Sequence, residues 1–391
     1  MTQPSRRICV VTGSRAEYGL LRGLLLRLRT DLAVTPLLIV TAAHLQPEFG
    51  LTVSEIEADG MPIAARVPLP LDGGTPLSAA QALGQGLGAM AEALRQLTPD
   101  IVVVLGDRIE LLAVASSCLL LGIPLAHIHG GEVTEGAIDD AIRHAVTKMA
   151  HLHFTAADTY RDRVLQMGEM NDRVFVTGAP GLDHITEPPA MSRDELAHDL
   201  GLALSGPVLA VTCHPETASG APLAAATAML AALDSVPQAA IVLTKANADP
   251  GGAAINQMIA QWADGRPNVL FVPSLGMKRY QSLLHIASAM VGNSSSGVIE
   301  APALGLPAVN IGDRQKGRLR SASIIDCEAT PQAVKNALAR ALSPAFQAEA
   351  KNAKAACGRG GAAEAIHRVL ATCDLAGLLK KTFVDRPAMR A

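Results

Sequence analysis

Short apolar runs alternate with longer amphipathic stretches through the first half of the chain. Four runs rich in Val, Ile and Leu occupy residues 8–13, 36–42, 101–107 and 124–130, and a helical pattern follows each of them. Continuous apolar strands separated by helices are typical of parallel βαβ units whose sheet is covered on both faces. The first half is therefore predicted to be a doubly wound α/β domain.

The same alternation returns in the second half of the chain. Between the two halves, a Pro-Pro pair is followed by Ser192-x-x-Glu195, a capping box that marks the start of a helix. We therefore predict an α/β protein of two Rossmann-like, doubly wound domains with a cleft between them and a boundary near residue 186. The apolar runs of the second half lie at 207–214, 239–245, 268–274, 287–293 and 307–312.

The end of the chain differs from both domains. Residues 345–380 are rich in alanine and helical in pattern, and the last nine residues form a tail. The predicted domain boundaries are 1–185, 186–365, and 366–391 for a final helix and tail.

Two stretches raise the question of a membrane or a secretion signal. Residues 111–128 are uncharged, but the break at Gly122-Ile123-Pro124 predicts a buried helix followed by a buried strand. The apolar run near the N-terminus stops at Thr12 after four residues, which is too short for a secretion signal. No membrane association is expected.

The composition agrees with a soluble globular protein. A length of 391 residues exceeds what one hydrophobic core usually supports, and the net charge of −3 gives no bias toward nucleic acid or an anionic membrane. The six cysteines form no C-x-x-C pair, so neither a zinc knuckle nor a disulfide scaffold is indicated. A reducing, cytoplasmic location is expected.

Polar residues directly after the apolar runs are the first candidates for chemistry, because open α/β sheets bind ligands beyond the carboxyl ends of their strands. Gly13 permits a tight turn after the first run, and Arg15 stands at the start of the next helix, where a phosphate would be well placed. An ordinary turn with a surface arginine is the alternative. Asp107 and Arg108 follow the third run, and Asp107 is either a chemical group or merely a helix cap.

A second candidate site begins after the run at 287–293. Asn293 to Gly297 contains three serines between a strand and a helix, where backbone amides and hydroxyls form an anion cradle. Glu300 lies about one turn inside that helix and either grips the hydroxyls of a ribose or interacts with the helix dipole. His214, Arg314 and Arg318 also follow strands and add donors. A Walker loop and a G-x-G-x-x-G pattern are absent, which argues against ATP-driven chemistry and hydride transfer.

The stretch HIHGGEVTEGAIDDAIRH, from His127 to His144, concentrates imidazoles and carboxylates around a Gly pair. His127 and His129 are two apart on a predicted strand and would face the same way, which permits metal ligation. Further ligands would have to come from elsewhere, and this mixture suits no single ion well, so acid–base use is favoured over a metal. In the helix that follows, Asp140 and His144 share one face, and the predicted core stripe is Ile138, Ala141, Ile142, Ala145, Val146 and Met149.

Six motifs in this order resemble those of a known enzyme family: VTGSRAEYG, LGDRIE, HIHGGEVTEGAIDDAIRHAVTKMAHLHF, CHPET, VGNSSSGVIEAP and IGDRQKGR. From about residue 8 to about residue 330, the chain resembles the hydrolysing UDP-N-acetylglucosamine 2-epimerases of bacterial sialic and related nonulosonic acid biosynthesis. The resemblance implies a GT-B architecture, a UDP-sugar substrate, no cofactor, and release of UDP and a free 2-epimerised N-acetylhexosamine. It also implies a homodimer or homotetramer, and a final helix that crosses back to the first domain.

The resemblance assigns roles to residues of this chain. It implies that Glu300 holds the ribose, that the region of Ser274 holds the uracil, and that the diphosphate is bound by Arg15, His214, Ser294, Ser295 and Arg314. Other residues assigned to the substrate site are Glu17, His44, Arg108 and Ser296. The catalytic groups map onto Asp107, Glu132, Asp139 and His129. Several relatives have Glu at the position of His129, whereas others share the histidine.

The chemistry explains why such groups are needed. The C2 proton of a sugar is barely acidic, so loss of UDP with oxocarbenium-like character at C1 should precede or accompany its removal and give a glycal. Water then adds at C1 while a proton returns to C2 from the other face. We expect Asp107 and either Glu132 or Asp139 to supply these acid–base roles, with His129 as a candidate proton donor.

Other functions stay open at this point. The same reaction on UDP-2,4-diacetamido-2,4,6-trideoxyglucose, on the legionaminic acid route, is one alternative. A GT-B glycosyltransferase would share the UDP cradle but need an acceptor groove, and a nucleotide-sugar sensor would have no need of opposed carboxylates. The non-hydrolysing epimerases share the fold, but HIHGGE and GNSSSG favour the hydrolysing branch.

Overall fold

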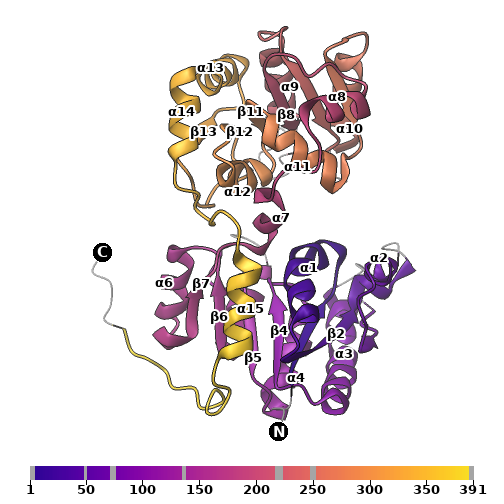
Figure 1. The fold of residues 1–391 in the computed structure, drawn as a ribbon, viewed down its shortest axis with the longest axis vertical. Coiled ribbons are helices and arrows are strands. Elements are labelled where there is room, and N and C mark those ends of the chain that lie inside the picture. Colours follow the sequence, from indigo (N-terminus) through magenta and orange to yellow (C-terminus); the bar gives the residue numbers. More distant parts are fainter. Residues whose placement is uncertain are drawn as a thin grey trace. The chain divides into compact units, whose positions relative to one another are not determined.

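The computed structural model describes residues 5–47, 51–70, 76–133, 138–215, 223–246 and 252–386. The chain divides into two compact units: unit 1 consists of Met1–Asp183 and Gly360–Ala391, and unit 2 of His184–Arg359. The polypeptide therefore leaves unit 1 after Asp183, forms unit 2, and returns to unit 1 (Figure 1). Each unit is an α/β sandwich and is described by itself.

Unit 1 is built on a seven-stranded sheet in the order β3-β2-β1-β4-β5-β6-β7, in which neighbouring strands run parallel. The four strands predicted from apolar runs are confirmed as β1, β2, β4 and β5. Three further strands of three or four residues were not predicted, because they are too short to show a pattern. The bounds are β1 Arg6–Thr12, β2 Val34–Thr41, β3 Ala65–Val67, β4 Ile101–Leu105, β5 Leu125–Ile128, β6 Leu152–Thr155 and β7 Val174–Val176.

Helices cover both faces of this sheet, because successive residues of a strand point to opposite sides. On β1, Ile8 and Val10 belong to one apolar cluster, whereas Cys9 and Val11 belong to another. The helices and 3₁₀ turns of unit 1 are α1 Arg15–Thr30, η1 Ala42–Leu45, α2 Val53–Ala58, α3 Pro76–Leu97, α4 Glu110–Leu121, α5 Ile138–Met149, α6 Asp158–Gln166, η3 Asn171–Arg173, η4 Pro180–Leu182 and α15 Ala362–Thr372, with α7 Asp183–Thr186 at the division between the units.

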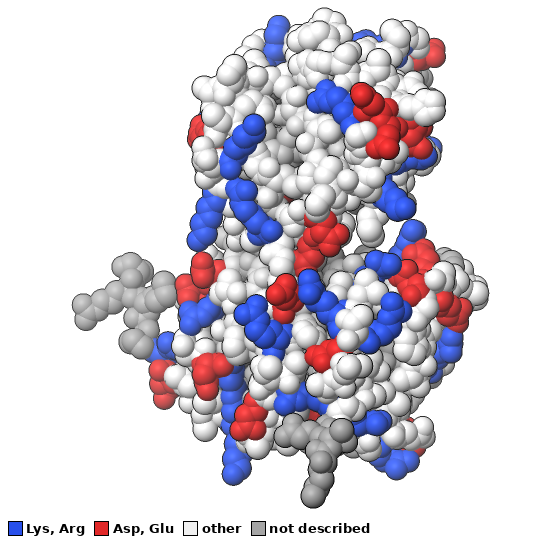
Figure 2. Space-filling view, in the orientation of Figure 1, with Lys and Arg blue, Asp and Glu red and all other residues white. Residues whose placement is uncertain are grey.

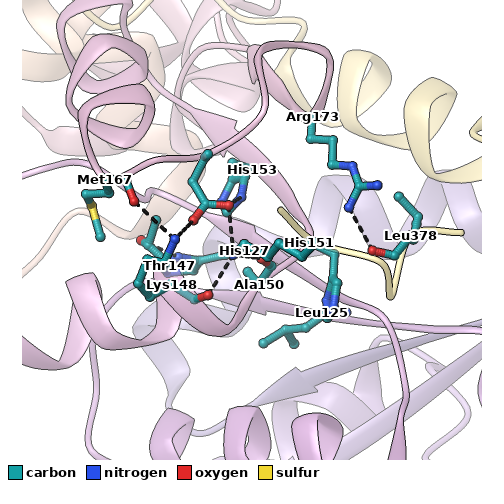
Figure 3. Close-up of polar contacts among 12 residues, drawn as sticks. Leu125, His127, Thr147, Lys148, Ala150, His151, His153, Met167, Arg173 and Leu378 are labelled. Carbon is teal, nitrogen blue, oxygen red and sulfur yellow. Dashed lines mark hydrogen bonds and ion pairs between the residues drawn. The ribbon is translucent and has the colours of Figure 1, made fainter. Parts of the chain in front are cut away.

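The C-terminal part of the chain completes unit 1. Helix α15 packs against α1, and its first two backbone amides donate to the Asp183 carboxylate at 2.9 and 2.7 Å. Beyond α15, the Leu378 carbonyl accepts from Arg173 at 2.7 Å (Figure 3). Lys381 forms an ion pair with the buried Glu169 at 2.7 Å. The residues after the last helix are thus fixed to unit 1 by buried polar contacts.

Unit 2 repeats the architecture with a six-stranded parallel sheet in the order β10-β9-β8-β11-β12-β13. All five strands predicted for the second half are confirmed, and β13 was not predicted. Two apolar clusters cover its two faces. The bounds are β8 Val208–Thr212, β9 Ala240–Thr244, β10 Val269–Val272, β11 Ala289–Gly292, β12 Ala308–Ile311 and β13 Ile324–Cys327.

The first helix of unit 2 begins where the capping box predicts. Ser192 accepts from the backbone amide of Glu195, and the Glu195 carboxylate accepts in return from the Ser192 amide. The Ala-rich segment from 345 forms two helices rather than one, since residues 353–361 contain three glycines and break the pattern. The helices are α8 Arg193–Leu200, α9 Ala224–Leu233, α10 Gly252–Ala263, α11 Gly276–Ile286, α12 Ser296–Ala303, α13 Pro331–Ala341 and α14 Pro344–Asn352.

Helix α5 is rotated relative to the predicted core stripe. Ile138 is 72% exposed, and Ala141 and Ala145 are also exposed. The predicted core residues Ile142 and Val146 are confirmed as buried, and Arg143 and Thr147 are buried beside them. Apolar spacing alone could not predict this face, because two of its members are polar and are buried only because they have partners in the fold.

The segment at 111–128 forms a helix and a buried strand, as predicted, but the helix is buried only as far as Cys118, and Leu119, Leu120 and Leu121 are exposed. Gly122 ends α4 in the left-handed conformation at φ 64°, and β5 follows three residues later. Within the described residues, no helix is both long and apolar enough to cross a membrane. On the face drawn in Figure 2, basic and acidic side chains are interspersed, in agreement with the small net charge.

Candidate functional site

The turn after β4 places Asp107 at the carboxyl end of the unit 1 sheet. Gly106 has φ 91°, a left-handed conformation that favours glycine, and the next residue leaves the strand. Helix α4 begins only at Glu110 and has no side-chain cap, so Asp107 does not cap it. The Asp107 carboxylate instead accepts from the guanidinium of Arg143, which is buried on α5. The capping alternative for Asp107 is therefore wrong, and its catalytic role stays a prediction.

The neighbouring strand end holds the second acid–base candidate. Strand β5 stops at Ile128, and His129 has φ 66°, so the expectation that His127 and His129 face the same way is wrong. His129 Nδ1 lies 2.5 Å from Glu132 Oε1, which joins two predicted catalytic residues in one pair. Among the described residues, no group of three or more His, Cys, Asp or Glu side chains could hold a metal ion.

Asp139 and Arg108 extend this acid–base surface. Asp139 lies in the first turn of α5, and its charge acts on Arg108. Burial lowers the pKa of Arg108, but the carboxylates of Glu110, Glu17 and Asp139 outweigh this effect and raise it. The Arg108 guanidinium donates to Glu110 Oε1 at 2.7 Å. The buried Glu110 carboxylate thus fixes the position of the exposed Arg108 side chain.

Glu17 and His44 lie beneath the turn after β1 rather than on its surface. Glu17 is 4% exposed and accepts from the Gly13 amide at 2.6 Å. Burial raises the pKa of Glu17 to about 8, against the lowering effect of that amide. The fully buried His44 has its two ring nitrogens 3.2 Å from Thr12 Oγ1 and 2.8 Å from Thr52 Oγ1. Both have the surroundings of structural residues.

Arg15 stands at the first position of α1, as predicted, with its side chain largely exposed. It forms an ion pair with Glu55 at 2.9 Å. An exposed pair of this kind is worth little free energy and exchanges partners readily, so an incoming phosphate can compete for the guanidinium.

In unit 2, Asn293 joins the ends of β8 and β11. Its buried side chain accepts from the His214 amide at 2.7 Å and donates to the His214 carbonyl at 2.9 Å. Gly292 allows this approach, because a Cβ at that position would lie 1.9 Å from the Thr212 carbonyl oxygen. Two predicted substrate-binding segments are therefore held side by side by one amide.

The serines after Asn293 lead into α12. Ser295 is the residue before the helix, and Ser294 Oγ accepts from the Ser296 amide at 3.4 Å. Arg314, from the loop after β12, donates to the Asn293 carbonyl at 3.2 Å. A helix N-terminus, hydroxyls and a guanidinium thus gather around one turn, which is an arrangement suited to phosphate.

A pocket of about 420 Å³ opens beside these serines within unit 2. It contains the predicted residues His214, Ser274, Ser294 and Ser296. Glu300 adjoins it through Tyr280, whose hydroxyl donates to Glu300 Oε2 at 3.0 Å. The lining also includes residues that sequence analysis missed: Thr212, Thr244, Lys245 and Tyr280.

Three of the missed residues had a signal in the sequence. Thr212, Thr244 and Lys245 end predicted strands, the position at which the other candidates were found. Tyr280 had no such signal, because it lies in the middle of α11 and reaches the pocket only through the fold. Lys245 adds a cation to the pocket and strengthens the case for an anionic ligand.

The candidate residues of the two units differ in chemistry. Unit 2 offers hydroxyls, a helix N-terminus, cations and one carboxylate placed for a diol, which suits a nucleoside diphosphate. Unit 1 offers Asp107, which is paired with Arg143, and the pair of His129 and Glu132, which suits proton transfer.

A family model and two related proteins all identify the same enzyme family. Residues 26–371 match the model of a family described as UDP-N-acetylglucosamine 2-epimerase. A GDP/UDP-N,N'-diacetylbacillosamine 2-epimerase (hydrolyzing) of Campylobacter jejuni is 42% identical over 325 residues, covering 83% of this chain and 84% of that protein. A UDP-N,N'-diacetylbacillosamine 2-epimerase (hydrolyzing) of Legionella pneumophila is 36% identical over 340 residues, or 86% and 89% of the two chains.

Among solved structures, a UDP-GlcNAc 2-epimerase of Neisseria meningitidis bound to UDP-GlcNAc superposes with a TM-score of 0.76. The match covers 93% of this chain and 99% of that one, at 16% sequence identity. Similarity at this level of identity supports the fold, and the expected GT-B architecture is confirmed.

Proposed function

The chain belongs to the UDP-N-acetylglucosamine 2-epimerase family and is a hydrolysing 2-epimerase of UDP-sugars, and we propose that UDP-2,4-diacetamido-2,4,6-trideoxyglucose is its preferred substrate. The products are UDP and a free sugar inverted at C2, which would feed nonulosonic acid biosynthesis. The main support is the pair of relatives at 42% and 36% identity, both named for N,N'-diacetylbacillosamine, the same diacetamido sugar. UDP-N-acetylglucosamine is the second candidate, because the family description names it.

In this proposal, unit 2 holds the nucleotide. The α12 N-terminus with Ser294, Ser295 and Ser296 binds the diphosphate, helped by His214 and Arg314. Glu300, oriented by Tyr280, accepts from the ribose hydroxyls, and the Ser274 region faces the uracil. Lys245 is added to this set because it lines the same pocket. These groups also stabilise UDP as it leaves.

Unit 1 supplies the proton transfers. Asp107, held by Arg143, removes the C2 proton as the C1–O bond to UDP breaks, and a glycal results. Water adds at C1, and the pair of His129 and Glu132 or the neighbouring Asp139 returns a proton to C2 from the other face. Arg15 and Arg108 contact the substrate from the same unit. Glu17 and His44 support the turn from beneath rather than bind the sugar.

The test is a substrate comparison with the purified protein. The protein is incubated with the diacetamido UDP-sugar, with UDP-N-acetylglucosamine, and with the GDP form of the diacetamido sugar. Released nucleotide is followed by chromatography, and the C2 configuration of the product by NMR. We expect UDP release and an inverted free sugar, with the highest kcat/KM on the diacetamido UDP-sugar. The Asp107→Asn variant serves as the inactive control.

Each alternative has a distinct outcome in this assay. Nucleotide release only after addition of a sugar acceptor would indicate a glycosyltransferase, and tight binding without release would indicate a sensor. An inverted product that still carries UDP would indicate a non-hydrolysing epimerase. Higher kcat/KM on UDP-N-acetylglucosamine would move the assignment to the second candidate.

Two further expectations belong to the proposal. The six cysteines form no disulfide in the structure, which suits the reducing cytoplasm proposed as the location of the protein. The homodimer or homotetramer expected for the family stays a prediction, and light scattering on the purified protein would test it.

A further inference from the structure

The Gly106–Asp107 turn is held at two points by one face of α5. Arg143 contacts the Asp107 carboxylate, and Thr147, four residues further along the helix, contacts the side chain of His127 on β5. Residues four apart lie on the same face of a helix, so one face of α5 serves both contacts. Arg143 and Thr147 are buried although they are polar, so the buried face of α5 differs from the apolar stripe predicted from the sequence.

His127 transmits the second contact to the turn. Its Nε2 lies 2.7 Å from the Gly106 carbonyl oxygen, and its Nδ1 lies 3.0 Å from Thr147 Oγ1. A carbonyl can only accept, so Nε2 must bear the proton and donate it. Nδ1 is then an acceptor, and the Thr147 hydroxyl must donate to it. The neutral ring of His127 therefore carries its proton on Nε2.

The surroundings keep this arrangement rigid. His127 is fully buried, and burial lowers its pKa to about 3, so the ring stays neutral at physiological pH. Figure 3 shows His127 and Thr147 together in the interior of unit 1, near His151 and His153. The Gly106 amide also donates to the Ile128 carbonyl at 3.0 Å, so both polar groups of Gly106 are tied to β5.

The first glycine of HIHGGE is explained by the same pair. A Cβ on Gly130 would lie 3.0 Å from Thr147 Oγ1 and 3.3 Å from His127 Nδ1. Both distances are shorter than ordinary contacts, so a side chain at this position would press on the two residues that hold the turn. The HIHGGE motif, which was predicted to take part in proton transfer, thus also contains the glycine that lets His127 and Thr147 pack together beside the Gly106–Asp107 turn.

We propose that His127 and Thr147 are positioning residues, which orient Asp107 for removal of the C2 proton through the Gly106 carbonyl. Neither residue needs to touch the substrate. The inference rests on the proposed role of Asp107. Because a misplacement of about 1 Å can lower a rate about 100-fold, loss of the donor to Gly106 should lower kcat while UDP binding in unit 2 is unaffected.

The test compares matched histidine variants of the full-length protein. His127→Leu removes the donor, and His127→Gln replaces it with an amide N–H at a similar reach. His151→Leu is the control, because His151 is also buried in unit 1 but accepts from the Leu125 amide at 3.2 Å and not from the Gly106–Asp107 turn. The readouts are kcat, KM and UDP affinity by calorimetry.

We expect His127→Leu to lower kcat about 10- to 100-fold with UDP affinity within about twofold of wild type. His127→Gln should recover most of the loss, and His151→Leu should keep kcat within about threefold of wild type. Thr147→Val, which removes only the hydroxyl, should lower kcat less than His127→Leu, and Thr147→Ser should restore it. The threonine pair provides the test if His127→Leu does not fold.

The proposal is overturned if His127→Leu, or Thr147→Val in its place, keeps kcat as high as His151→Leu does. It is also overturned if His127→Gln gives no recovery, since a merely structural role would not depend on that N–H. The Asp107→Asn variant separates this inference from the proposed function. If that variant stays active, the assignment of Asp107 has failed, and a kcat loss in His127→Leu cannot then act through it.

Discussion

The two units have the same architecture but differ in the polar side chains that they bury. Unit 1 buries Glu17, Glu110, Arg143 and Glu169, together with four histidines, 44, 127, 151 and 153. The buried polar residues described in unit 2 are neutral amides and hydroxyls, such as Asn293, and each histidine of unit 2 keeps part of its surface exposed. Among the residues that the structure describes, the buried carboxylate, guanidinium and imidazole groups are therefore confined to unit 1.

The difference matches the chemistry proposed for each unit. Proton transfer needs carboxylates and imidazoles held in defined orientations, and burial with a partner supplies that orientation. Binding a nucleoside diphosphate needs donors that remain accessible, and the open pocket of unit 2 supplies them. Changes in unit 1 should therefore affect turnover and acid stability, whereas changes in unit 2 should affect nucleotide affinity.

The largest effect is expected from Asp107→Asn. Loss of the base should lower kcat by about 10²- to 10⁴-fold, while UDP binds to unit 2 as before. The control is Asp100→Asn, at the other end of β4, where the carboxylate accepts from the Arg7 amide at 2.7 Å. That variant should keep most of the activity. Steady-state kinetics and calorimetry with UDP measure both quantities, and near-normal turnover in Asp107→Asn would contradict the account.

A smaller effect is expected from acid on the stability of unit 1. Burial lowers the pKa of His127 to about 3 and those of His44 and His151 to about 4. Below about pH 6.5 the unfolded chain binds protons at these three positions and the folded chain does not, which lowers stability as pH drops from 6.5 toward 4. Glu17 acts in the opposite direction, because burial raises its pKa to about 8 and the folded chain therefore binds its proton first. Three histidines outweigh one carboxyl group, so the net stability of unit 1 should fall. Each fully displaced histidine contributes at most about 1.4 kcal/mol per pH unit.

Denaturation followed with two probes tests the location of this effect. Trp262, the only tryptophan in the sequence, lies on α10 and reports on unit 2, whereas circular dichroism reports on both units. Between pH 7 and pH 5 the dichroism midpoint should fall more than the fluorescence midpoint. Equal shifts of the two midpoints would indicate acid-sensitive groups in both units and would contradict the proposed difference between them.

The smallest effect is expected from the ribose contact in unit 2. Glu300→Gln should weaken UDP binding about tenfold, since a hydrogen bond to a charged group contributes about 1.5–3 kcal/mol. Tyr280→Phe, which removes only the hydroxyl that orients Glu300, should weaken it about threefold. Calorimetry gives both values. A large loss of kcat with unchanged UDP affinity would show that Glu300 belongs with the catalytic groups instead.

The sequence predicts the parts of the fold that depend on long apolar runs. Nine strands, the break at Gly122 and the capping box at Ser192 are local patterns, and the structure confirms them. Strands such as β3 and β7 have three residues each and are defined by their neighbours in the sheet, so no local pattern marks them.

The candidate site shows the same limit. Strand ends are visible in sequence, so Asp107, His214 and Ser294 could be proposed. The partners of these residues depend on tertiary structure: Arg143 and Thr147 are buried on a helix face that apolar spacing assigns to other residues. Polar side chains are buried when partners compensate for lost water, and those partners lie far apart in the chain.

The most direct test of the account is the reaction in D₂O, with the product examined by NMR. In the proposed mechanism, a side chain of unit 1 removes the C2 proton and a solvent-derived proton returns to the other face. It predicts one deuterium at C2 of the inverted sugar, and no deuterium in the remaining substrate. An inverted product that keeps its original protium at C2 would contradict the proton-transfer mechanism.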